Sequence, residues 1–133
     1  MKIRHNILFF ILIAISCGVT NGISENKAKK IAERYLIEQG WANKRLDKNS
    51  TEIDIKGLKL NGSIDEHLNL RYNTLIPKAV YSKKKDDFWI IGFRYNQNQN
   101  GIKNTDKNIG RAVKVSLNGT ECHMIWEMYD LTK

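Results

Sequence analysis

The sequence predicts an α+β domain in which one N-terminal amphipathic helix packs on an antiparallel sheet. Three observations lead to this class. Apolar residues first recur at helical spacing, later segments alternate between apolar and polar residues, and turn-forming dipeptides separate several of those segments. Because one helix cannot bury its apolar face alone, we expect it to lie against the sheet.

The first 22 residues have the pattern of a secretory signal. Lys2 and Arg4 form a basic start, nine apolar residues follow at positions 7–15, and Ser16 and Gly18 are small. Nine helical residues at about 1.5 Å each cover only about half of a ~30 Å hydrocarbon core, so a permanent membrane span is not expected. The sequence therefore predicts an exported chain with a single domain at residues 23–133.

Two cleavage sites are compatible with this leader. A general signal peptidase would cut after Gly22 and leave a freely periplasmic or secreted protein. Residues 14–18, reading AISCG, also resemble a bacterial lipobox, in which Cys17 becomes the lipidated first residue. Two or three acyl chains would hold the domain on a membrane of the cell envelope almost permanently.

The charge of the chain is basic, but its lysines are scattered. Without the leader the formal charge falls from +8 to +6, and the one run of three lysines, at positions 83–85, is followed at once by Asp86 and Asp87. A nucleic-acid surface needs clustered basic residues with groove-reading or stacking elements, so no nucleic-acid partner is expected. Cys122 is the only cysteine of the predicted domain, which excludes an intramolecular disulfide.

The helix is predicted between Ser24, a good N-cap, and Gly40, a helix-terminating residue. Its apolar face comprises Ala28, Ile31, Ala32, Tyr35 and Leu36.

The rest of the domain is predicted as strands. They are expected at residues 51–56, 68–72, 78–83, 88–95, 110–117 and 120–128. Gly57 shifts the phase of the first alternation and indicates a β-bulge, while Asn118-Gly119 is a strong hairpin signal. Residues 96–108 are polar and without periodicity, and they form either a solvated connection or a binding loop.

Three segments carry a resemblance to a known family. The helix ISENKAKKIAERYL, the strand DFWIIGF and the hairpin RAVKVSLNGTECHMI resemble the cystatin and nuclear-transport-factor-like group, and within it the bacterial immunity-protein domain. The same helix, with its I-S-x-x-x-A-x-x-I-A pattern, is also similar to the start of PepSY-type domains. The resemblance implies one helix on a curved antiparallel sheet and a binding role. Immunity domains neutralise a toxin and PepSY-type domains are linked with restraining peptidases, so a protein partner is expected and no catalytic residue or cofactor is required.

The last predicted strand contains the residues that most resemble reactive groups. Cys122 and His123 are adjacent, so in a strand they point to opposite faces and cannot form a catalytic pair. His123 with Glu121 or Glu127 has a spacing that a metal could use, but a charged outer face explains it more simply, and no metal is expected. The alternating residues Cys122, Met124, Trp126 and Met128 are predicted to face the core.

The candidate partner-binding residues are Trp89, Arg94 and Tyr95, together with the loop at residues 96–108. Trp, Tyr and Arg dominate the residues that contribute most to binding at protein interfaces. The alternative interpretation places Trp89 in the core. A second function, small-ligand binding in a cone between helix and sheet, remains open, and an enzyme has the least support because no catalytic constellation is visible.

Overall fold

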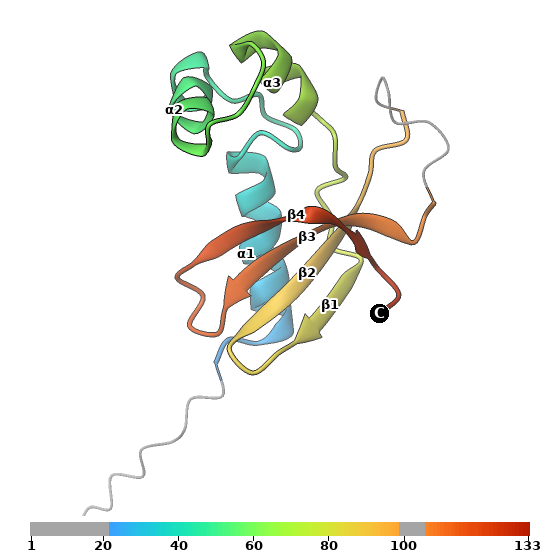
Figure 1. Cartoon of the computed structure of the whole chain (residues 1–133). Coiled ribbons are helices and arrows are strands. Elements are labelled where there is room, and N and C mark those ends of the chain that lie inside the picture. Colours follow the sequence, from blue (N-terminus) through green and yellow to red (C-terminus); the bar gives the residue numbers. More distant parts are fainter. Residues whose placement is uncertain (1–21, 99–105) are drawn as a thin grey trace, which may run out of the picture.

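The computed structural model describes residues 22–98 and 106–133. These residues form an α+β fold, as the sequence predicts (Figure 1). The elements are α1 (Glu25–Glu38), α2 (Lys48–Leu58), α3 (Ile64–Arg71), β1 (Tyr81–Lys84), β2 (Phe88–Arg94), β3 (Ile109–Ser116) and β4 (Cys122–Asp130). The predicted signal and its Cys17 lie outside the described residues, apart from Gly22.

The helix α1 occupies the segment in which the sequence predicts a helix. The Ser24 side chain accepts a hydrogen bond from the Lys27 backbone N–H at 3.3 Å, and Gly40 closes the helix with a φ of +73°. A left-handed residue at this position favours glycine. Ala28, Ala32 and Leu36 are completely buried on the face toward the sheet.

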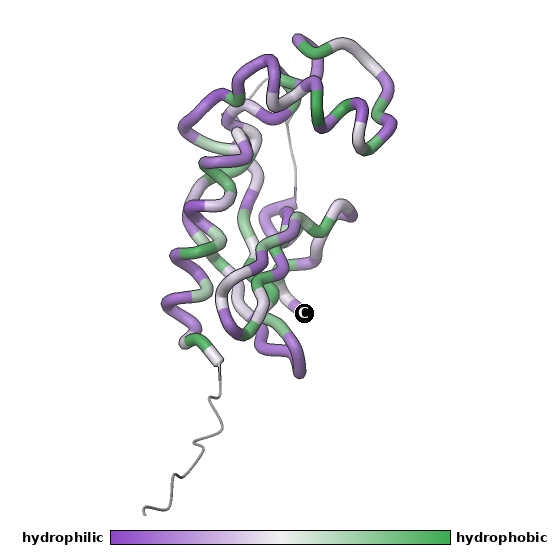
Figure 2. Tube along the Cα trace, turned by 90° about the vertical axis from the view of Figure 1, so that its left-hand side faces the viewer, coloured by the Kyte–Doolittle hydropathy of each residue, from purple (hydrophilic) through white to green (hydrophobic). Residues whose placement is uncertain are grey.

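The four strands form an antiparallel sheet in the order β1-β2-β3-β4. Side chains alternate between its faces, so one face of β2, β3 and β4 packs on α1. The buried residues of this face are Ile91, Phe93, Val113, Val115 and Met124. In the side view of Figure 2, α1 and the sheet form two layers, which are called the α1–sheet layer below.

The two elements between α1 and the sheet are helices, which corrects the sequence prediction. Residues 51–56 were expected to form a strand and belong to α2, Gly57 lies in the last turn of that helix rather than in a bulge, and residues 68–72 fall in α3 and its C-cap. Asp47 caps α2 by accepting from the Ser50 N–H at 2.8 Å. The described chain therefore has three helices rather than one, and α2 and α3 pack on each other as a separate pair (Figure 1).

The sheet face turned away from α1, called the outer face, is covered in part by the end of the chain. Tyr81 and Tyr129 contact each other there, with ring centroids 5.6 Å apart. A Cβ atom on Gly92 would lie 2.5 Å from the Leu131 side chain, so glycine at this position allows Leu131 to pack on the strand. No helix within residues 22–98 and 106–133 is long and apolar enough to cross a membrane.

Candidate functional site

An irregularity in β4 exposes two large apolar side chains at the edge of the sheet. Ala112 pairs with Ile125 and Gly110 with Tyr129, so β3 advances by two residues while β4 advances by four. The segment between these pairs bulges from the ladder and leaves Trp126 52% exposed and Met128 69% exposed. These two side chains are called the Trp126 patch.

This bulge corrects the predicted core face of the last strand. Met124 is buried and Cys122 packs against the core, as the alternation predicts. Trp126 and Met128 continue the same alternation in sequence, but they lie where the register shifts and are exposed instead of buried. Alternation predicts which face of a sheet a residue lies on only while the strand keeps the same register with its neighbour.

The exposed Trp126 ring rests on a buried aromatic side chain. Its centroid lies 6.2 Å from that of Trp41, with the ring planes inclined at 59°. Trp41 is only 8% exposed, and the guanidinium of Arg71 lies 5.7 Å from its ring. Arg71, also nearly buried, donates from Nη1 to Asp54 Oδ2 at 2.8 Å. The patch therefore has a fixed support that joins α1's C-terminal loop, α2, α3 and β4.

β4 lies at an edge of the sheet, and β3 is its only strand neighbour in the described part of the chain. A regular edge strand can recruit another strand through its free backbone groups, but a bulge interrupts that pairing. A partner at this edge would therefore contact the side chains of the Trp126 patch, because the bulge prevents continuous backbone pairing.

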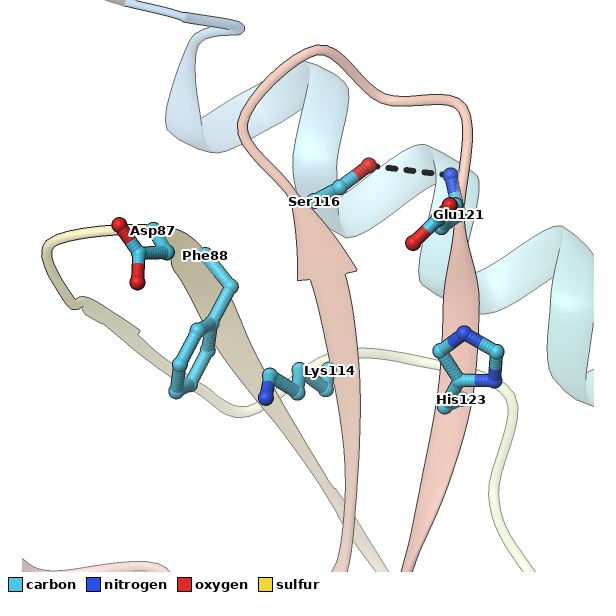
Figure 3. Close-up of a pocket in the computed structure, with 6 residues that line it drawn as sticks. All are labelled: Asp87, Phe88, Lys114, Ser116, Glu121 and His123. Atoms are coloured by element: carbon cyan, nitrogen blue, oxygen red, sulfur yellow. Dashed lines mark hydrogen bonds between the residues drawn. The ribbon is translucent and has the colours of Figure 1, made fainter.

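A second surface is a hollow at the hairpin end of the outer face, with a volume of about 270 Å³. It is lined by Asp87, Phe88, Lys114, Ser116, Glu121 and His123 (Figure 3). The Lys114 ammonium lies 3.9 Å from the centroid of the Phe88 ring, and Ser116 Oγ accepts from the Glu121 N–H at 3.0 Å. Two carboxylates, an ammonium group and an imidazole give this hollow the chemistry to hold a small charged molecule.

The structure does not bring the predicted binding residues Trp89, Arg94 and Tyr95 together. Trp89 is partly buried against the core, and its Nε1–H donates to the Ile23 carbonyl at 3.2 Å. Tyr95 is 9% exposed and forms a bridge with Leu75, whereas Arg94 is exposed on the outer face. Trp89 and Tyr95 thus pack in or against the core, as the alternative interpretation of Trp89 predicts.

The polar loop of the sequence prediction can be placed only at its ends. Residues 96–98 and 106–108 belong to the described residues, and residues 99–105 do not. Asn96 Oδ1 accepts from the Asn98 N–H, and Asp106 Oδ1 accepts from the Asn108 N–H. Local turns therefore begin and end the segment.

Cys122 lacks the surroundings of a nucleophile. Burial raises the pKa of its thiol to about 11, so the thiolate is scarce at neutral pH. His67 lies on α3, where Nε2 is 2.6 Å from the Asn61 carbonyl oxygen, and His123 lies on the opposite face of β4 from Cys122.

The Glu121–His123 pair considered for a metal lines the outer hollow. Within residues 22–98 and 106–133, no three His, Cys, Asp or Glu side chains gather as a metal site would require.

No pattern in the sequence indicates the Trp126 patch, because alternation places Trp126 and Met128 on the core face. The set Cys122, Met124, Trp126 and Met128 alternates without a break, and only the pairing of β4 with β3 shows that the register changes after Ile125. Trp41 lies between the predicted elements, so no periodic pattern marks it.

No family model, no curated protein and no solved structure matches this chain.

Proposed function

We propose that this chain is an exported binding module that acts on another protein, as an immunity-type or inhibitor protein does. The observation that carries the proposal is the Trp126 patch, a half-exposed tryptophan supported by a buried tryptophan. Exposed aromatic side chains held in place by packing are typical of residues that dominate binding at interfaces. The cost of ordering such a side chain on binding is small, because Trp41 already restricts it.

The arrangement of the α1–sheet layer supports the cystatin-like part of this proposal. The resemblance implies a helix on an antiparallel sheet, and α1 lies across one face of a four-stranded antiparallel sheet. The α2–α3 pair would then be an addition between the helix and the sheet. In this proposal the signal is cut before Cys17, and Cys17 becomes the lipidated first residue that anchors the domain to the cell envelope.

The central test is co-purification of the full chain, tagged after Lys133, from its native envelope. The proposal predicts a stoichiometric protein partner that is lost with Trp126→Ala and kept with Ile53→Ala. Ile53 is a matched control, because it is apolar and 70% exposed but lies on α2. A partner that both variants retain equally would place the interface elsewhere, and no stoichiometric partner from the native envelope would contradict the proposal.

The anchoring is tested separately by fractionation. Cys17→Ala is expected to move the protein from the membrane to the soluble fraction, because the acyl chains would have no attachment site. Continued membrane binding of this variant would contradict lipidation at Cys17.

A second candidate function is binding of a small charged ligand, and the outer hollow favours it. The space between α1 and the sheet offers such a ligand little room, because Leu36, Ile91 and Phe93 are fully buried against one another there. A ligand in the hollow would contact Lys114 and Glu121, so native mass spectrometry of the purified chain, with Lys114→Ala as the comparison, distinguishes this candidate from the first.

A further inference from the structure

We propose that the Trp126 patch receives a cationic side chain, an arginine or a lysine, from a basic segment of the protein partner. This inference rests on the proposed function and names the chemistry of the partner at that site. It is carried by the open aromatic face of Trp126 and by the charges along β4.

Aromatic rings of this chain repeatedly lie under cations. Arg71 lies over Trp41 at 5.7 Å, Lys84 over Trp89 at 5.9 Å and Lys114 over Phe88 at 3.9 Å. In the described part of the chain, the contact recorded for the Trp126 ring is with Trp41, and no cation lies over it. Tryptophan offers the most favourable aromatic face for a cation. The most exposed of the three tryptophans is thus the one whose ring has no cation from the chain itself.

The charges along the two edges of the sheet differ in sign. Residues 121–130, which include β4, contain Glu121, Glu127 and Asp130 and no lysine or arginine. Residues 78–85, which include β1, contain four lysines and no acidic residue. Asp130 forms an ion pair with Lys133 at 3.5 Å, so the acidic character of β4 rests on Glu121 and Glu127, and these attract a basic partner rather than an acidic one. Like charges also oppose the pairing of β4 with β4 of a second copy.

The support beneath Trp126 does not repel an incoming cation. Arg71, the cation beside the Trp41 ring, forms an ion pair with Asp54 at 2.8 Å, so its positive charge is compensated. Glu127 lies between Trp126 and Met128 in sequence and is exposed. A cation over Trp126 would thus meet an exposed negative charge on the same strand and a compensated Arg71 beneath the ring.

The test measures binding of two peptides to the purified full chain by fluorescence polarisation. One peptide alternates arginine and serine, and the other alternates glutamate and serine at the same length. The arginine peptide is expected to bind more tightly, although the net charge of the chain opposes it. Trp126→Leu, which keeps apolar area but removes the ring, is expected to weaken its binding by about threefold to fivefold. Glu127→Lys is expected to weaken it by about threefold, and less at high salt.

Ile53→Ala is the matched control and is expected to leave the affinity unchanged. Equal binding of both peptides, or unchanged binding by Trp126→Leu, would overturn the inference. Self-association of the chain that Trp126→Leu abolishes would also overturn it, because a second copy would then be the occupant. If a native partner is captured through Trp126 while the arginine peptide does not bind, the proposed function stands and only the cationic chemistry is wrong.

Discussion

The α1–sheet layer and the α2–α3 pair are stabilised by different kinds of contact. Between α1 and the sheet, Ala28, Leu36, Phe93 and Val113 are completely buried, so apolar burial dominates. Within the α2–α3 pair, two of the three buried residues are Thr51 and Arg71, which are polar or charged. Its helices also depend on side-chain caps at Asp47 and Ser63.

The two regions are therefore expected to differ in stability and in their response to solution conditions. Apolar burial contains no titratable group, whereas carboxylate caps and ion pairs respond to pH and to screening by salt. The Trp126 patch lies where the two regions meet, since Trp41 and Arg71 support it from the polar side. The α1–sheet layer is therefore expected to be a rigid scaffold, and the α2–α3 pair a part that opens more easily.

The largest effect is expected in the α1–sheet layer. Phe93→Ala should lower the free energy of unfolding by about 3–5 kcal/mol, because it removes a fully buried ring and leaves a cavity. Urea unfolding followed by circular dichroism measures this loss. Leu70→Ala on α3 is the control and should change stability by less than about 0.5 kcal/mol, because Leu70 is exposed. Equal losses in the two variants would remove the distinction between the regions.

The next effect concerns the ion pair that links α2 to α3. Arg71→Met should cost about 1–3 kcal/mol, because it removes a charge-assisted hydrogen bond and leaves Asp54 unpaired but partly exposed to water. Hydrogen exchange should speed up for α2 and α3 amides and stay unchanged in β2 and β3. A double-mutant cycle with Asp54→Asn isolates the pair, and purely additive losses would show that the two side chains do not interact.

The sequence predicted the elements of the α1–sheet layer well, because each of them follows the regular spacing of its own type, helical in α1 and alternating in the strands. Ala28, Ala32 and Leu36 repeat at helical spacing, and the Asn118-Gly119 turn joins β3 to β4 as expected. The α2–α3 pair was predicted wrongly because Ile53 and Ile55 alternate with charged residues as a strand would. In the structure Thr51 and Ile55, four residues apart, share the inward side of α2, and Ile53 points to solvent.

Two local signals could have indicated these helices. Asp47 is a good N-cap, and Ser63 with Glu66 three residues later has the sequence of a capping box, which the structure contains. The Trp126 patch could not be predicted, because it depends on how β4 pairs with β3 over the bulge. Long-range register has no signature within a single strand.

Acidification should weaken the capping box at the start of α3. The Ser63 backbone N–H holds the pKa of Glu66 below its ordinary value of 4.5, with help from the Ser63 side chain. Because the folded-state pKa is lowered, this contribution is complete above about pH 4.5 and is lost as the pH falls below that value. Hydrogen exchange at decreasing pH should show α3 losing protection. Glu66→Gln should make α3 less dependent on pH, and an unchanged dependence would show that another group is responsible.

The smallest effect on stability is expected at the point where the two regions meet. Trp126→Ala should cost about 0.5–1 kcal/mol, since the ring is half exposed and its main loss is the contact with Trp41. Urea unfolding of this variant beside Arg71→Met measures the difference. A loss as large as that of Phe93→Ala would mean that Trp126 belongs to the core and could not act as a binding residue. A small loss together with a large loss of partner binding would show that this tryptophan is exposed for recognition, on a scaffold that folds without it.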